Sequence, residues 1–207
     1  MQPVFVVLFL ASVCLASAFD KRIIRANATF SSRSSYDSLT VPNGARWGDW
    51  AWVEMCPEQS YAIGFSIKVE EYGGGGVDDT SLNGIRLFCS TEHTNNIMYT
   101  IESKSGQFGH WSGIRWCPQN GVLLSFQLKV EPDQGPILDD TAANNIKFRC
   151  SNGLPLEETG GLFGDYSEWS KPCPKGGICG IQTKQELYQG IMTDDTSLND
   201  VRFFCCE

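Results

Sequence analysis

The sequence predicts an all-β fold in which three similar sheets surround one core, and three observations lead to that prediction. Nearly the same segment occurs three times, as "VDDTSLNGIRLFC", "LDDTAANNIKFRC" and "TDDTSLNDVRFFC". Each copy follows a stretch in which apolar residues alternate with small or polar ones. None of the copies carries the apolar spacing of an amphipathic helix. A segment used three times is more often a building unit than a reaction centre, because one reaction centre suffices.

The three copies align without gaps on their aspartate pairs. Each second aspartate lies ten residues before a cysteine, at Cys89, Cys150 and Cys205. About fifteen residues before these aspartates stand "AIGFSIKVE", "LLSFQLKVE" and "ICGIQTKQE", and further upstream stand "RWGDWAWVEMCP", "QFGHWSGIRWCP" and "LFGDYSEWSKPCP". We therefore expect a single domain, residues 41–207, that is built from three repeats at about 41–100, 101–158 and 159–207.

Alternation with a period of two identifies the strands inside each repeat. In the first repeat Ile63, Phe65 and Ile67 share one face, and the strand that ends at Cys89 alternates in the same way. Gly- and Pro-rich stretches separate the strands, at 73–76, 132–136 and 153–161. One repeat alone has too little core, so we expect three disulfide-stapled sheets to pack around a pseudo-threefold axis as a prism. A barrel of three hairpin units is the alternative.

The N-terminal residues indicate a secretory signal peptide at 1–18. The apolar run from Val4 to Leu15 is too short to span a bilayer and is followed by Ala16-Ser17-Ala18, a small-x-small cleavage pattern. We expect a secreted, extracellular chain without membrane insertion, in which an N-terminal segment, 19–40, precedes the domain. A sequon at Asn27 predicts a glycoprotein.

The cysteine pattern predicts four disulfides. Nine cysteines are encoded, and Cys14 lies in the expected signal peptide. Register pairs the rest as Cys56–Cys89, Cys117–Cys150, Cys173–Cys205 and, by remainder, Cys179–Cys206. Neighbours on a strand point to opposite faces, so Cys205 and Cys206 should choose different partners. Pairing of Cys173 with Cys206 remains open as the alternative.

The net charge of −8 argues against nucleic acid and anionic membranes as partners. We expect no cofactor and no metal, because the chain has no C-x-x-C and only two histidines. A monomer is expected.

Two groups of residues are candidates for ligand binding. The repeated Asp, Thr and Asn residues are suited to fixing tight turns. Acidic side chains gathered near the axis could also bind sugar hydroxyls or a calcium ion, although the chain has no EF-hand spacing. Tryptophans upstream of the C-P cysteines either pack against the sheets or stack on sugar rings. The candidate set is Asp78, Asp79, Asp139, Asp140, Asp194, Asp195, Trp50 and Trp111.

No residue is assigned a catalytic role. A glycosidase needs one protonated and one ionised carboxyl group, whereas three near-equal aspartate pairs single out neither. His110 stands where the other repeats have Asp49 and Asp165, which indicates a tolerant loop position. A weak carbohydrate-active enzyme, catalysing glycan transfer or hydrolysis with the repeated aspartates, is the alternative to a non-enzymatic protein.

The combination of G-x-W or G-x-Y, C-P, an alternating strand and D-D-T-x-x-N before a strand ending in cysteine resembles the vitelline membrane outer layer protein I family. The resemblance covers about residues 36–207. It implies a β-prism of three Greek-key sheets. It also implies a secreted structural component of an extracellular layer, such as the egg vitelline envelope, with coat proteins or glycans as partners.

Overall fold

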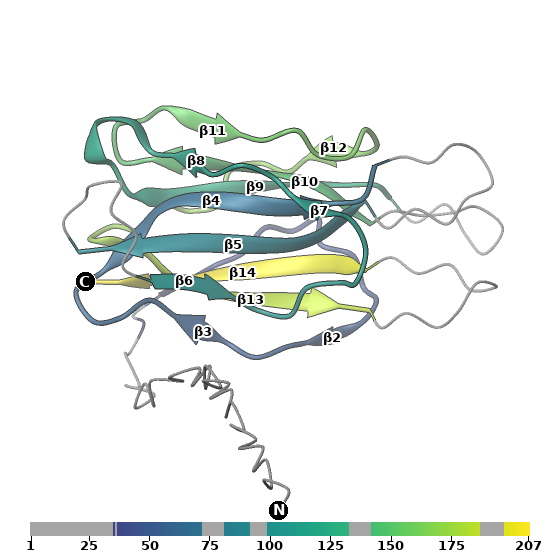
Figure 1. The fold of residues 1–207 in the computed structure, drawn as a ribbon, viewed down its shortest axis with the longest axis horizontal. Helices are drawn as coiled ribbons and strands as arrows, with labels where there is room; N and C mark the ends of the chain where they lie inside the picture. Colours follow the sequence, from purple (N-terminus) through teal and green to yellow (C-terminus); the bar gives the residue numbers. More distant parts are fainter. Residues whose placement is uncertain (1–34, 36, 72–80, 92–98, 133–141, 187–196) are drawn as a thin grey trace, which may run out of the picture. The chain divides into compact units, whose positions relative to one another are not determined.

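The computed structural model describes residues 35, 37–71, 81–91, 99–132, 142–186 and 197–207, which lie in a compact unit spanning Ser31–Glu207. Over these residues the chain forms β-strands and one short 3-10 helix, Pro118–Asn120, without an α-helix. The strands gather into three antiparallel sheets, which confirms the predicted all-β fold (Figure 1). We number the sheets 1, 2 and 3 after the repeat that supplies their two long central strands.

The central strands lie where the period-two pattern predicts them. Sheet 1 contains β4 (Tyr61–Val69) and β5 (Leu82–Ser90), with β6 (Tyr99–Glu102), β7 (His110–Trp111) and β8 (Arg115–Trp116) at its edges. Sheet 2 contains β9 (Leu123–Val130) and β10 (Ala143–Cys150), with β11 (Pro155–Glu157) and β12 (Asp165–Tyr166) at its edges. Sheet 3 contains β13 (Gly177–Gln185) and β14 (Leu198–Cys206), with β1 (Asp37–Leu39), β2 (Asp49–Trp50) and β3 (Glu54–Met55) at its edges.

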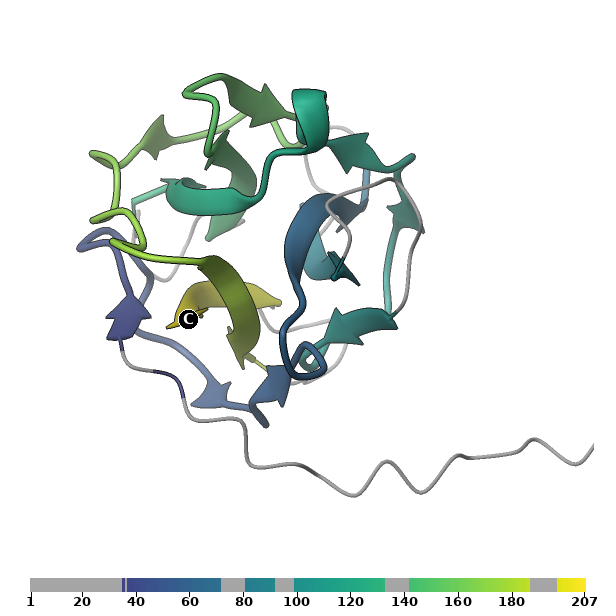
Figure 2. The same ribbon diagram turned by 90° about the vertical axis from the view of Figure 1, so that its left-hand side faces the viewer.

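One edge of each sheet comes from the repeat that follows in the cycle. β7 and β8 belong to the second repeat but pair with β4, and β12 belongs to the third repeat but pairs with β9. The cycle closes because β2 and β3, from the first repeat, pair with β13 of the last (Figure 2). These edge strands have only two residues each, so they carry no alternation that a sequence pattern could reveal.

The core lies where the three sheets face one another. Four fully buried phenylalanines meet there: Phe65 of sheet 1, Phe126 and Phe148 of sheet 2, and Phe203 of sheet 3. The ring centroids are 4.8 Å apart for Phe65 and Phe148, and 4.8 Å apart for Phe126 and Phe203. Such pairs contribute about 0.5–1.5 kcal/mol each beyond the burial of their area. All three sheets therefore contribute to one aromatic cluster.

The outer face of the central strands is also covered. Gly64 and Ser66 of β4 point away from the core, yet both are buried. A side chain on Gly64 would collide with the backbone of Arg115 and the ring of Trp116, because β8 crosses directly over it. The short edge strands therefore form a second layer around the prism.

All four expected disulfides are present. The bridges are Cys56–Cys89, Cys117–Cys150, Cys173–Cys205 and Cys179–Cys206. The adjacent Cys205 and Cys206 take different partners, as strand alternation requires. The alternative pairing of Cys173 with Cys206 is therefore excluded.

Candidate ligand-binding pocket

The residue just before the second central strand of every sheet has a positive φ, which is 51°, 46° and 53° at Ser81, Ala142 and Ser197. A fully buried asparagine follows two residues later, and its Nδ2 donates to the carbonyl of the positive-φ residue at 3.3 Å. These asparagines are Asn83, Asn144 and Asn199. The repeated asparagine thus holds an unfavourable backbone conformation in place.

Three crossing loops, residues 43–47, 104–108 and 159–163, lie against the first residues of these strands. The backbone N–H of Ala45, Gly106 and Gly161 donates to the carbonyl of the neighbouring buried asparagine at 2.7–2.8 Å. A lysine from the first central strand also holds each loop, because its Nζ donates to two loop carbonyls. These lysines are Lys68, Lys129 and Lys184. The loops are therefore fixed to the prism in an equivalent way.

Neighbouring sheets meet at three seams, which we call seam 1–2, seam 2–3 and seam 3–1 after the sheets they join. Across seam 1–2, Ser81 Oγ donates to Asn144 Oδ1 at 3.0 Å. Across seam 3–1, Ser197 Oγ donates to Asn83 Oδ1 at 2.8 Å. Buried hydrogen bonds thus join the serine that precedes the second central strand of one sheet to an asparagine of the next.

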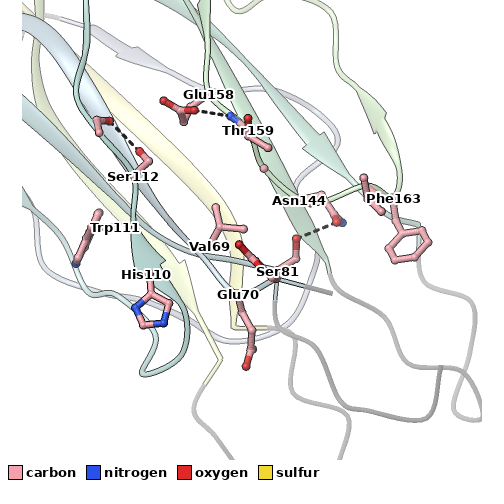
Figure 3. A pocket seen from close by; sticks show the side chains of 15 residues that line it. Val69, Glu70, Ser81, His110, Trp111, Ser112, Asn144, Glu158, Thr159 and Phe163 are labelled. Carbon is pink, nitrogen blue, oxygen red and sulfur yellow. Dashed lines mark hydrogen bonds between the residues drawn. The ribbon is translucent and has the colours of Figure 1, made fainter. Parts of the chain in front are cut away.

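A pocket of about 510 Å³ opens above the serine–asparagine bond of seam 1–2 (Figure 3). Three segments form its walls: 69–71 at the end of β4, 110–113 around β7, and 158–163, which includes a crossing loop. Ser81 and Asn144 lie at its base. The walls combine aromatic and apolar side chains with carboxylates, hydroxyl groups and a histidine, so the pocket can recognise a ligand that has both apolar and hydroxyl-rich faces.

Trp111 forms one wall, and sheet 1 holds its ring in place. The Arg86 guanidinium lies 3.7 Å from the ring centroid, and Arg86 Nε is 2.5 Å from Glu102 Oε2. The same arrangement recurs in the other sheets, where Lys147 faces Tyr166 and Arg202 faces Trp50. An aromatic ring fixed by a cation on one side loses little conformational entropy when a ligand contacts it.

Glu158, on the opposite wall, bridges the two sheets. Its carboxylate accepts hydrogen bonds from Arg115 Nε at 2.6 Å and Nη2 at 3.1 Å, and from Thr159 N at 2.9 Å. Burial raises the pKa of the Glu158 carboxyl, but the Arg115 and Thr159 hydrogen bonds outweigh it and leave the pKa below its usual value. Glu158 is therefore ionised at neutral pH and can only accept hydrogen bonds.

The candidates from the sequence fall into three groups. Trp111 lines the pocket, whereas Trp50 lies on β2 of sheet 3, outside the pocket lining. The remaining candidates and the sequon lie outside the described residues: Asp78, Asp79, Asp139, Asp140, Asp194, Asp195 and Asn27. The hypothesis that these aspartates bind a ligand stays a prediction.

Sequence reasoning did not single out several residues that line the pocket. His110, interpreted from the sequence as a tolerant loop position, contributes to one wall, and Glu70 and Glu158 supply carboxylates. A signal existed in the repeat alignment. Gly113 stands where the other repeats carry Trp52 and Glu168, which marks the place where the second repeat lacks a large side chain.

A second, more open hollow of about 560 Å³ lies on the other side of Trp111 and is bordered by Trp52, Arg86 and Lys104. The described residues hold no group of three His, Cys, Asp or Glu side chains arranged for a metal ion. They also include no helix long and apolar enough to cross a membrane.

Comparison with solved structures places this fold among the β-prism lectins. Frutapin, a lectin from Artocarpus incisa, superposes with a TM-score of 0.54 at 10% identity, covering 84% of this chain and 99% of that one. The mannose-binding lectin from Champedak gives 0.53 at 9% identity, covering 84% and 99%. An artocarpin–mannotriose complex gives 0.50 at 11% identity, covering 83% and 97%. At such identities the likeness concerns the fold alone.

Sequence comparison is more specific. The family model for vitelline membrane outer layer protein I matches residues 37–207. A vitelline membrane outer layer protein 1 homolog from Mus musculus is 52% identical over 168 residues, 81% of this chain and 82% of that protein. The homolog from Homo sapiens is 47% identical over 175 residues, 84% of this chain and 85% of that protein. The chain belongs to the vitelline membrane outer layer protein I family.

Proposed function

We propose that this chain is a secreted component of an extracellular layer such as the egg vitelline envelope, and that it binds glycans through the pocket at seam 1–2. Family membership supports the structural role, and four disulfides suit an oxidising extracellular setting. Each bridge that closes 32 or 33 residues contributes about 3–4 kcal/mol in the chain-entropy model. The protein acts as a monomer whose partners are glycans or glycan-bearing coat proteins.

The observation that carries the glycan proposal is the make-up of the pocket. Sugars combine an apolar ring face with hydroxyl groups. The pocket offers Trp111, Leu162 and Phe163 for the former. Glu70, Ser112 and Thr159 offer oxygen atoms for the latter. A β-prism of similar architecture carries mannotriose in the artocarpin complex, which supports a sugar ligand for this fold.

Substitution of Trp111 tests the proposal. We expect Trp111→Ala to weaken glycan binding by at least about tenfold, since an aromatic contact worth roughly 1.4 kcal/mol is lost. Trp169→Ala is the matched control, because Trp169 is also half-buried beneath an arginine, Arg149 at 4.2 Å, but lies outside the pocket lining. Binding is measured on a glycan array and then by calorimetry. Equal losses in both variants, or no loss in Trp111→Ala, would contradict the assignment of the pocket.

We propose that binding occurs without turnover. Glu158 cannot supply the proton that glycoside cleavage needs, because its pKa is lowered and Arg115 holds it ionised. The alternative, a carbohydrate-active enzyme, depends on Asp79, Asp140 and Asp195. Incubation of the native chain with chito-oligosaccharides should leave them unchanged. Turnover that disappears in the folded Asp79→Asn, Asp140→Asn, Asp195→Asn triple variant would establish the enzyme instead.

A further inference from the structure

The three seams share one backbone plan but are filled differently. In seam 3–1, Trp52 covers the junction: its Nε1 donates to Glu102 O at 3.3 Å, and Ser103 Oγ donates to Trp52 O at 2.7 Å. Thr183 Oγ1 and Gln185 Nε2, from β13, donate to Lys104 O in the crossing loop at 2.7 Å and 3.1 Å. Side chains thus tie sheet 3 to the loop of sheet 1.

Seam 2–3 is closed by a different residue. Asn43, at the position of Lys104 in the crossing loop, reaches across the junction, and its Nδ2 donates to Leu128 O at 2.8 Å. Leu128 occupies the same strand position as Thr183. A direct hydrogen bond between strand and loop therefore joins sheets 2 and 3 as well.

Seam 1–2 has neither the strand hydrogen-bond donors nor the tryptophan of seam 3–1 at the corresponding positions. The strand positions of Thr183 and Gln185 are occupied by Ile67 and Val69, whose side chains cannot donate hydrogen bonds. Gly113 replaces Trp52, and a Cβ built on it would meet no atom within 4 Å. The seam is held instead at its outer end, by Arg115 and Glu158. The pocket includes the space beside Gly113, where seam 3–1 carries the side chain of Trp52.

The charged side chains that line this pocket are acidic. Glu70, Glu71 and Glu158 line it, while its described lining includes no lysine or arginine. Arg115 lies close to this lining but is engaged with Glu158. The ammonium groups of Lys68 and Lys129 are engaged with carbonyls of the crossing loops. Ionised carboxylates accept hydrogen bonds from sugar hydroxyls and repel sulfate or carboxylate groups, more strongly where water is partly excluded.

We infer that the unfilled seam 1–2 is a specificity-determining site that admits uncharged glycans and rejects anionic ones. This inference rests on the proposed function and refines it. The prism has three equivalent seams. Trp52, Thr183 and Gln185 close seam 3–1 and Asn43 closes seam 2–3, whereas Gly113 leaves seam 1–2 open. The carboxylates that line the pocket at seam 1–2 then select ligands by their charge.

The test places the large side chain of seam 3–1 into seam 1–2. Gly113→Trp should reduce binding of a neutral glycan by at least about tenfold, while the thermal unfolding midpoint stays that of the native chain. Glu168→Trp, at the equivalent position of seam 2–3, is the matched control and should bind as the native chain does. Native-level binding by Gly113→Trp would overturn the inference, yet leave glycan binding at another surface intact.

Charge selection is tested with paired ligands. A neutral oligosaccharide and its sulfated form are titrated against the native chain and against the Glu70→Gln, Glu71→Gln double variant. The native chain should prefer the neutral form by at least about tenfold, and the double variant should lose most of that preference. Equal or tighter binding of the sulfated form by the native chain would refute the inference. Failure of the native chain to bind any glycan would refute the proposed function as well.

Discussion

Two seams of the prism are built from a serine and a glycine, whereas the third is built from two alanines. In seam 1–2 the hydroxyl of Ser81 occupies the space that a side chain on Gly161 would need, and Ser197 and Gly106 are arranged likewise in seam 3–1. Seam 2–3 has Ala142 and Ala45 at the corresponding positions, and Ala45 N makes the equivalent bond to Asn199 O. A serine–glycine pair and an alanine–alanine pair have the same number of side-chain heavy atoms, so the side-chain volume at the seam is nearly the same.

A neighbouring pair of positions follows the same rule. Gly44 would collide with Asp200 if it had a side chain, and Gly160 would collide with Asn145. In the first sheet the glycine is on the other partner, because Gly84 lies against Ser105. Each crossing loop and the strand of its own sheet therefore have room for one side chain between them, from either partner. At these positions the repeats differ by paired exchanges in which a larger residue on one segment accompanies a smaller one on the other.

Among substitutions at these seam positions, Gly161→Ala should cause the largest loss of stability. The new Cβ would overlap Ser81 Oγ and Asn144 Oδ1, which are both buried, so we expect a loss of about 3 kcal/mol in unfolding free energy. The Ser81→Ala, Gly161→Ala double variant recreates the alanine pair and should recover most of the loss. Urea titration of both variants checks this. Additive losses would show that the two residues do not share the space.

Ala142→Ser should have a smaller effect, about 2 kcal/mol of destabilisation, because the added hydroxyl enters space that the methyl group of Ala45 fills in the alanine seam. Adding Ala45→Gly should reverse the sign by creating a third serine–glycine seam. A double-mutant cycle followed by thermal unfolding measures the coupling. A coupling energy near zero would contradict the exchange rule.

Asp200→Asn is expected to give the smallest change, a gain of about 1 kcal/mol at pH 7 after allowance for partial solvent exposure. Burial, only partly offset by the Val201 N–H, Lys184 and Arg202, raises the pKa of the Asp200 carboxyl to about 6. Asn145 occupies the same place in sheet 2 and makes the same 2.8 Å contact with the next backbone N–H. Asn145→Asp is the reverse control and should destabilise sheet 2.

The sign of the pH dependence follows from that raised pKa. The native state holds the Asp200 proton more tightly than the unfolded chain does, so the stabilisation is complete below about pH 4 and is lost as pH rises through about 6. Asp200→Asn should remove this slope from the unfolding free energy between pH 4 and 6. An unchanged slope in the variant would assign the titration to another group.

Much of the fold could be predicted because its signals are local. Alternation in the central strands, the spacing from Cys56 to Cys89 and its copies, and the opposite faces of Cys205 and Cys206 all depend on residues close in sequence or on exact repetition. The strand positions, the three sheets and the four disulfides are accordingly confirmed. Trp111, which lines the pocket, is among the sequence candidates because an aromatic residue recurs at its position in each repeat.

The seams and the pocket could not be predicted, because they depend on contacts between residues of different sheets that lie far apart in the sequence. Alignment places Gly161 opposite Gly106 and Ala45, but only the folded chain brings Gly161 against Ser81. In the same way, Gly113 becomes informative only once Trp52 is seen to cover seam 3–1. Burial of Gly64 depends on a two-residue edge strand that leaves no periodic trace.

The pairing of β2 and β3 with β13 has a consequence for biosynthesis. The segment made early in translation finds its partner only when the last repeat has left the ribosome. Until then the nascent chain exposes unpaired strand borders, which invite association with other chains. Truncation anywhere before Gly177 should therefore yield an insoluble product rather than a shorter prism, and maturation becomes an all-or-none event that follows release of the complete polypeptide.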